Sequence, residues 1–285
     1  MNIVGKWNGN QYKIIGLIGK GNFGKVYIVR DSNGNDLALK LSQELLSLTN
    51  EYNALVEFKG IEFVPSVYDF DDWENGGEIW YFIVMDYIEG KDLGTISKEE
   101  KLETRNVFKI GLILLNMLKK IDNLGYKYTD IKLENIILDN RGYIYLIDYG
   151  SLVKKDKPTK EYTQIYNIKC WDTKNKYNHT TSILFSITML MVSLIAKTEY
   201  NPIIYDLDDI IEKIYKFPLK VEEKYFLIDG LKGKFKTFEK YCISLYKIVN
   251  KSKCNKKLSK IDYVLIASIV SFVFIVFIGI KKFFY

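Results

Sequence analysis

A glycine-rich segment at residues 19–24 lies between two short apolar runs, and this arrangement limits how the first part of the chain can fold. The two runs, residues 14–18 and 26–30, are rich in β-branched side chains and predict strands. A third run at residues 37–41 follows a turn with an Asn-Gly pair, which suits a tight hairpin. The glycine segment therefore joins two antiparallel strands. This excludes a dinucleotide-binding fingerprint, because the glycines of that motif lead into a helix N-terminus.

The three glycines of this segment, Gly19, Gly21 and Gly24, would let backbone amides come close to phosphate groups. Taken alone, the segment also fits an ordinary flexible hairpin. The polar residues that follow along the chain favour the phosphate interpretation.

Those polar residues occur in a regular order. Lys40 lies at the end of the third strand, and a helix predicted at residues 42–58 carries Glu44 and Glu51 on one face. Another strand is predicted at residues 79–85. Two polar motifs come next, Tyr128-Thr129-Asp130-Ile131-Lys132-Leu133-Glu134-Asn135 and Asp148-Tyr149-Gly150.

This set of motifs, in this order and spacing, resembles the eukaryotic-type protein kinases. The resemblance is good from residue 10 to about residue 195 and poor over 195–250. It implies an α+β fold with two lobes: an antiparallel five-stranded N-lobe at residues 10–88 and a mostly helical, shortened C-lobe at 89–250, with a hinge near 86–90. It also implies an enzyme that transfers the γ-phosphate of ATP, with Mg²⁺, to Ser or Thr hydroxyls of proteins.

The resemblance implies a nucleotide site between the lobes. The three glycines would cover the phosphates, and Lys40 would hold the α- and β-phosphates while paired with Glu51, with Glu44 as the alternative partner. Apolar side chains and hinge backbone groups would hold the adenine. These residues would be Val26, Ala38, Met85, Asp86, Ile88 and Ile137.

The resemblance also implies the catalytic groups. Asp130 would accept the proton of the substrate hydroxyl or orient it, and Lys132 would neutralise the γ-phosphate. Asn135 and Asp148 would hold Mg²⁺ through the hard oxygen ligands that this metal prefers. Lysine two residues after Asp130 is similar to Ser/Thr kinases more than to Tyr kinases.

The chain departs from the family pattern around the motif at residues 128–135 and after Gly150. Thr129 stands where an arginine usually pairs with a phosphorylated activation segment, so we expect activity without that phosphorylation. The expected Ala-Pro-Glu is Ile168-Lys169-Cys170, and the acid that normally starts the next helix is Thr181. These losses predict a weakened platform for protein substrates.

Charge and composition exclude several other functions. Residues 251–285 hold seven lysines and one acid, which accounts for the whole net charge of +6. The preceding 250 residues are therefore neutral, and we expect no nucleic-acid partner for them. A single histidine, His179, excludes sites that need two imidazoles, and it is expected in a loop.

The C-terminus has the sequence of a membrane anchor. Residues 263–280 carry no charge, and as a helix they would span roughly 27 Å, enough for the hydrocarbon core of a bilayer. We therefore predict a basic juxtamembrane linker at 251–260, a transmembrane helix at 261–280 and a short tail at 281–285. The kinase domain would then be cytosolic and the lipid bilayer a partner. A second apolar run, residues 182–196, is short for a span and predicts the buried central helix of the C-lobe.

Two other functions remain open at this point. The altered platform would also fit a catalytically weak or inactive kinase-like scaffold on a membrane. It would equally fit a small-molecule kinase on the same fold.

Overall fold

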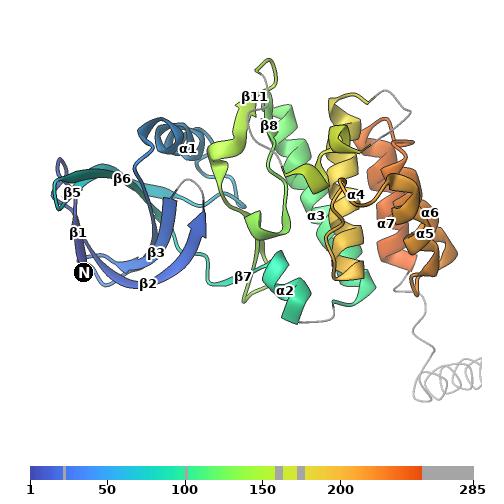
Figure 1. Cartoon of the computed structure of the whole chain (residues 1–285), viewed down its shortest axis with the longest axis horizontal. Helices are drawn as coiled ribbons and strands as arrows, with labels where there is room; N and C mark the ends of the chain where they lie inside the picture. Colours follow the sequence, from blue (N-terminus) through green and yellow to red (C-terminus); the bar gives the residue numbers. More distant parts are fainter. Residues whose placement is uncertain (22–23, 100–101, 158–162, 172–176, 252–285) are drawn as a thin grey trace, which may run out of the picture.

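The computed structural model of the chain describes residues 1–21, 24–99, 102–157, 163–171 and 177–251. These residues form an N-terminal lobe built on a β-sheet and a C-terminal lobe built mainly of helices, joined by residues 87–89 (Figure 1). The predicted anchor at 261–280, its linker at 251–260 and the tail at 281–285 lie outside the described residues, except for Lys251. The α+β class and the two-lobed arrangement are those implied by the resemblance.

The N-lobe sheet is antiparallel throughout, with strand order β1-β2-β3-β4-β6-β5. The glycine-rich segment joins β2 to β3, as the sequence predicts. The strands are β1 (Asn2–Val4), β2 (Gln11–Gly21), β3 (Gly24–Arg30), β4 (Asp36–Ser42), β5 (Val67–Asn75) and β6 (Glu78–Asp86).

The sheet has six strands, so the prediction of five is wrong. The additional strand is β1, which pairs with the start of β2 and lies before residue 10, where the N-lobe was expected to begin. Ile3 of β1 is completely buried in a small apolar core inside the sheet, beside Val29, Leu39 and Phe82. Burial of this side chain explains why so short a segment joins the sheet.

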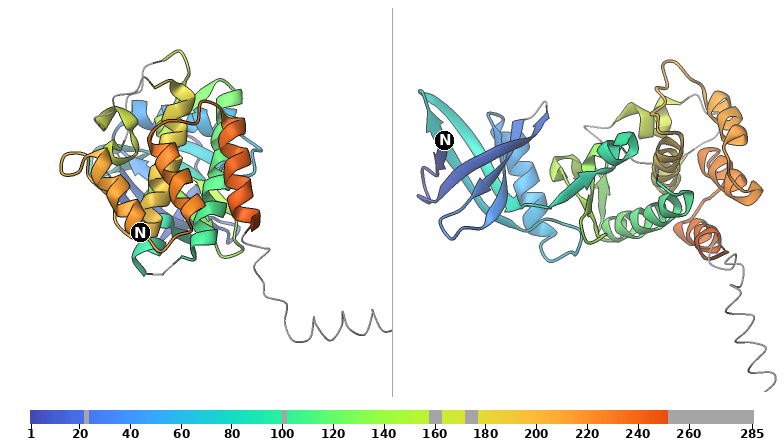
Figure 2. Two further views of the ribbon diagram at one scale, coloured as in Figure 1. Left: turned by 90° about the vertical axis from the view of Figure 1, so that its right-hand side faces the viewer. Right: turned by 90° about the horizontal axis from the view of Figure 1, so that it is seen from below.

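The two edges of the sheet also meet. The backbone N–H of Lys6, just after β1, donates to the carbonyl oxygen of Asp72 in β5 over 2.9 Å. Asp69 and Asp71 of β5 are buried, and both accept hydrogen bonds from the loop after β1, including 2.6 Å from Asn8 Nδ2 to Asp69. Hydrogen bonds from the loop after β1 to β5 therefore connect the two ends of the strongly curved sheet shown in Figure 2.

One helix, α1 (Leu45–Glu57), packs against the sheet at the side facing the C-lobe (Figure 1). It begins at Leu45, later than the predicted residue 42, because the hydroxyl of Ser42 accepts the backbone N–H of Glu44 over 3.0 Å and holds that turn outside the helix. Glu51 lies on the buried face of α1, and Glu44 precedes the helix.

The C-lobe is a set of helices with two small sheets on the side that faces the N-lobe. The small sheets have the orders β10-β9-β7 and β11-β8. The helices are α2 (Leu93–Glu99), α3 (Thr104–Asn123), α4 (His179–Ala196), α5 (Leu207–Lys216), α6 (Val221–Leu231) and α7 (Phe238–Lys251). The small strands are β7 (Gly90–Asp92), β8 (Tyr126–Tyr128), β9 (Ile136–Asp139), β10 (Ile144–Leu146) and β11 (Leu152–Lys154).

Helix α4 is the centre of this lobe, packed between α3 and α6 (Figure 2). Among the described residues it is the one helix long and apolar enough to cross a membrane, but most of it is buried among the other helices. The burial agrees with the prediction of a central core helix. His179 is the first residue of α4 and not a loop residue as expected.

Candidate active site

Lys40 connects three parts of the fold through its ammonium group. It lies on β4, and its ammonium contacts Glu51 Oε2 of α1 at 2.5 Å and Asp148 Oδ1 at 3.2 Å. Glu51 is almost completely buried, whereas Glu44 lies outside α1, so the geometry selects Glu51 as the lysine's partner. The ion pair thus connects the N-lobe sheet, its helix and the Asp148 loop of the C-lobe.

Burial on its own would lower the pKa of Lys40, but the carboxylates of Glu51 and Asp148 outweigh it and hold the pKa above its ordinary value. Lys40 is therefore a permanent cation beside Asp148, the carboxylate predicted to hold a metal. Asp148 has left-handed backbone angles, with φ of 62°, which are uncommon for a residue with a side chain. This strained conformation aims its carboxylate at Lys40.

The described glycines of the β2–β3 hairpin are not equivalent. A Cβ on Gly24 would lie 2.3 Å from the carbonyl oxygen of Leu41, and its φ is +145°, so only glycine fits here. Gly19 would meet Val26 at an ordinary 3.6 Å, and a Cβ on Gly21 would point into open space. Space around Gly19 and Gly21 is consistent with their predicted place over the phosphates.

The apolar residues predicted for the adenine pocket lie on strands of both lobes. Ala38 of β4 lies opposite Met85 of β6, and Val26 lies opposite Lys40. Ile137 is on β9, next to Asp92 of β7 in the C-lobe.

The two predicted hinge residues lie at the end of β6 and just after it. The backbone N–H of Asp86 donates to the carbonyl oxygen of Ser66 over 2.9 Å, so this N–H is engaged within the N-lobe. Ile88 follows in the half-buried segment between the lobes. These placements are compatible with the predicted pocket, whose residue roles stay predictions.

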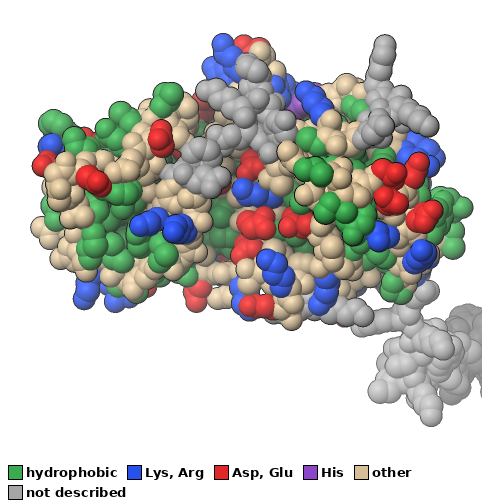
Figure 3. All heavy atoms as spheres, viewed as in Figure 1, with side chains coloured by type: hydrophobic (Ala, Val, Ile, Leu, Met, Phe, Trp, Pro, Cys, Tyr) green, Lys and Arg blue, Asp and Glu red, His purple; other side chains and the backbone are tan. Residues whose placement is uncertain are grey.

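Asp130 lies at the centre of a second polar cluster. Its Oδ2 contacts Lys132 Nζ at 2.7 Å and accepts a hydrogen bond from Asn135 Nδ2 over 3.2 Å. Its Oδ1 accepts a hydrogen bond from Thr163 Oγ1 over 2.7 Å. Burial would lower the pKa of Lys132, but Asp130 keeps it raised, so Lys132 is a cation here. Figure 3 shows acidic side chains gathered at the middle of the molecule, between the sheet lobe and the helical lobe.

Asn135 and Asp148 fit a Mg²⁺ ion chemically. Asn135 uses its amide nitrogen on Asp130, with a further 2.9 Å bond to the Asp130 carbonyl, which leaves its side-chain oxygen as a ligand. Lys40 uses Oδ1 of Asp148, so Oδ2 remains for a metal. Within the described ranges no three His, Cys, Asp or Glu side chains come together as metal ligands. Such a sparse protein set suits Mg²⁺, which usually takes one or two protein carboxylates and completes its shell with water and phosphate oxygens.

Two tyrosines, Tyr128 and Tyr149, pack beside the Asp148 loop. The rings of Tyr128 and Tyr149 meet edge to face, with 5.9 Å between centroids. The Tyr128 hydroxyl donates to the carbonyl oxygen of Ile147, directly before Asp148. Both residues thus provide aromatic packing, and the Tyr128 hydroxyl adds a polar bond that the sequence did not indicate.

The segment after Gly150 is held by hydroxyl groups. Thr129, in place of the usual arginine, donates from Oγ1 to the carbonyl of Ser151 over 2.8 Å. Tyr166 donates its hydroxyl to Glu199 Oε1 over 2.5 Å, and its carbonyl accepts from Ser186 over 2.6 Å. These contacts occur where the sequence departs from the family pattern, so this segment keeps a hydrogen-bonded framework despite the losses noted above.

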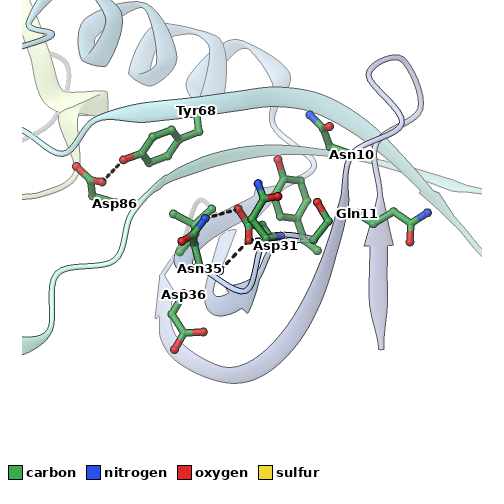
Figure 4. A pocket seen from close by; sticks show the side chains of 11 residues that line it. Asn10, Gln11, Asp31, Asn35, Asp36, Tyr68 and Asp86 are labelled. Atoms are coloured by element: carbon green, nitrogen blue, oxygen red, sulfur yellow. Dashed lines mark hydrogen bonds between the residues drawn. The ribbon is translucent and has the colours of Figure 1, made fainter.

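A separate polar hollow of about 630 Å³ lies on the N-lobe, beside the β3–β4 turn (Figure 4). Its carboxylates are occupied locally: Asp31 accepts from Asn35, and Asp86 accepts from Tyr68. Lys40, Asp130 and Asp148 do not line it. The hollow is therefore separate from the clusters around Lys40 and Asp130.

Some contacts of the site were not predicted. The bond between Thr163 and Asp130 was not predicted from the sequence. Nor were the contacts of Tyr166 with Glu199 and of Thr129 with Ser151. Residues far apart in the chain make these contacts, and no local sequence pattern predicts them.

The fold and this site together define a protein kinase. The protein kinase domain model matches residues 12–263, and the chain belongs to this family. It is 31% identical over 241 residues to the serine/threonine-protein kinase YabT of Bacillus subtilis (strain 168), covering 82% of this chain and 70% of that protein. The family and this relative assign the chain to the protein serine/threonine kinases.

More distant similarity extends to eukaryotic proteins. The chain is 28% identical over 205 residues to ribosomal protein S6 kinase alpha-6 of Danio rerio, a match that covers 66% of this chain and only 27% of that protein. A putative casein kinase I of Caenorhabditis elegans, C03C10.2, is 31% identical over 169 residues, which are 52% of this chain and 46% of that protein. These matches therefore concern the kinase domain alone.

Proposed function

We propose that this kinase transfers the γ-phosphate of ATP, in the presence of Mg²⁺, to Ser or Thr hydroxyls of proteins, and that its C-terminus tethers it to a membrane. The observation that carries the first part is the pair of clusters described above. Lys40 with Glu51 and Asp148 forms one, and Asp130 with Lys132 and Asn135 forms the other.

In this proposal the first cluster holds the nucleotide. Lys40 binds the α- and β-phosphate oxygens, and Glu51 keeps the ammonium in position. Asn135 and Asp148 would hold Mg²⁺, which supplies charge neutralisation for the triphosphate when bound. Phosphoryl transfer needs alignment and charge stabilisation more than covalent chemistry, so a rigid ion pair between two lobes serves it well.

The second cluster acts on the acceptor. The substrate hydroxyl donates a hydrogen bond to Asp130, which receives its proton as the oxygen–phosphorus bond forms and the bond to ADP breaks. Lys132 balances the charge on the transferred group. Thr163 lies on the other carboxylate oxygen of Asp130, so the segment that carries the acceptor is in contact with the base.

The acceptor class can be tested directly. The full chain in detergent would be given labelled ATP, Mg²⁺ and equal amounts of matched Ser, Thr and Tyr peptides, with small alcohols in parallel. Label on Ser or Thr peptides alone supports the proposal. Label on small alcohols but on no peptide would instead identify a small-molecule kinase.

The membrane part of the proposal depends on sequence alone. The uncharged run at 263–280 is long enough to span a bilayer, and lysines flank it on both sides. Tethering would confine the enzyme to a surface and raise its effective concentration toward acceptors there. Resistance of the full chain to carbonate extraction, and release of a chain ending at residue 250, is the expected result; extraction of both would contradict it.

A further inference from the structure

One half-buried carboxylate in the C-lobe binds both ends of the segment that follows the Asp148 loop. Asp122 lies in the last turn of α3, and its side chain is only 14% exposed. Its Oδ1 contacts Lys155 Nζ at 2.7 Å and His179 Nε2 at 2.9 Å. Lys155 follows β11, and His179 begins α4, so the two partners of one oxygen atom lie 24 positions apart in the chain.

The position of Asp122 is unfavourable without these partners. A helix C-terminus carries partial negative charge, so an acid in the last turn is repelled. The cationic partner Lys155 and the ring N–H of His179 offset that repulsion. Another lysine, Lys127 of β8, lies near His179, but its ammonium donates to the carbonyl oxygen of Lys157 over 2.6 Å. Asp122 is therefore the acceptor that the two segment ends share.

This contact is connected to the catalytic base through a short ladder. Strand β8 runs from the Asp122 end of the lobe to the Asp130 loop, and β11 pairs with it. At one end of the ladder Lys155 donates its backbone N–H to Gly125 over 2.9 Å, next to Asp122. At the other end Thr129, the residue directly before Asp130, donates its hydroxyl to the carbonyl oxygen of Ser151.

The second end of the segment is held through α4. The Asn178 side chain caps this helix by accepting the backbone N–H of Thr181 over 2.8 Å, which fixes the direction of the chain at His179. Helix α4 in turn holds residues 163–171 through Ser186 and the carbonyl of Tyr166. Thr163, in that stretch, touches Asp130.

We propose that Asp122 is a positioning residue for protein substrates: by binding Lys155 and His179 it holds both ends of the acceptor-binding segment so that Thr163 stays on Asp130. The inference rests on the proposed function. In this chain the side chain of Asp122 does what a guanidinium–phosphate pair would do in a kinase with arginine at position 129. Nucleotide binding at Lys40 does not depend on it.

The experiment compares Asp122→Asn with Glu62→Gln in the full chain. Glu62 is an exposed control for the loss of an acid–lysine pair: it contacts Lys120 of α3 at 2.9 Å but neither segment end. We expect Asp122→Asn to lower kcat/KM for a protein acceptor by about tenfold or more, since small misplacement of reacting groups is costly. The KM for ATP should be unchanged in both variants. An equal loss in Glu62→Gln, an equal rise in the KM for ATP, or no loss in Asp122→Asn would overturn the proposal.

A second measurement does not need activity. Amide hydrogen exchange of residues 163–171 should become faster in Asp122→Asn and in Lys155→Met, while exchange of α1 stays as in the wild type. Unchanged exchange of residues 163–171 would contradict the proposal, even if the enzyme phosphorylates no protein. Absence of any protein phosphorylation by the wild type would instead contradict the proposed function, so the two failures are distinguishable.

Discussion

Thr163 donates a hydrogen bond from Oγ1 to Oδ1 of Asp130 over 2.7 Å, although 33 residues separate them in the chain. The bond connects the segment proposed to bind the acceptor to Asp130, the predicted catalytic base. It also leaves Lys132 and Asn135 on the opposite carboxylate oxygen, so Asp130 is held from both sides.

Replacing Thr163 with Val should therefore reduce protein phosphorylation more than nucleotide binding. We expect kcat with a protein acceptor to fall about tenfold, because the base loses one of the contacts that orient it. The KM for ATP should not change. Thr198→Val, at an exposed threonine after α4, is the control and should behave as the wild type; equal effects of the two substitutions would contradict the assignment.

Phosphorylation of the segment after Gly150 should not be needed for activity. Thr129 supplies no guanidinium for a phosphate, and its hydroxyl is already bonded to Ser151. Protein treated with a phosphatase, checked by mass spectrometry to be unphosphorylated and then assayed in its first turnovers, should keep its rate within tenfold of the untreated enzyme. A larger loss, restored by rephosphorylation, would show that the prediction is wrong.

Lys40 and Glu51 should be coupled in stability as well as in activity. Lys40→Met leaves a nearly buried carboxylate without its cation, which should cost about 3–5 kcal/mol in the free energy of unfolding. The double variant Lys40→Met/Glu51→Gln should recover most of that loss and still be inactive, since no ammonium binds the phosphates. Urea denaturation measures the first effect and a kinase assay the second. Additive losses would mean that the two side chains do not act as a pair.

The single histidine predicts a direction for the pH dependence of stability. Burial lowers the pKa of His179, and the nearby carboxylate of Asp122 only partly opposes this. The folded protein therefore binds the proton less well than the unfolded chain, and the free energy of unfolding should fall as the pH drops below about 6.5. In His179→Gln the slope between pH 5.5 and 7 should be smaller. An unchanged slope would rule out His179 as its source.

The motifs predicted which polar residues lie together better than they predicted the packing. Lys40, Asp130 and Asp148 were identified because their order in the chain is specific, and the structure brings each of them to the junction of the lobes. Strand β1 was missed because three residues give no usable periodicity. It joins the sheet through buried Ile3 and through carboxylates of β5 more than 60 residues away.

The choice between Glu44 and Glu51 shows the same limit. Both lie on one face of an ideal helix over residues 42–58, so spacing alone could not separate them. A local bond from Glu44 to the Ser42 hydroxyl delays the start of α1 and removes Glu44 from that face. The sequence Ile168-Lys169-Cys170 predicts a weakened substrate platform. Other contacts hold this segment in place, such as Tyr166 with Glu199, and only the fold brings these residues together.

The most direct test of the account is transfer of label from γ-labelled ATP to a generic protein acceptor, by the full chain and by Asp148→Ala, with and without Mg²⁺. We predict transfer by the wild type that needs Mg²⁺. We also predict a loss of at least about a hundredfold in Asp148→Ala, because a ligand of the metal is gone. Equal transfer by the two proteins, or no transfer by the wild type under any condition, would contradict the claim that these residues form a working phosphotransfer site.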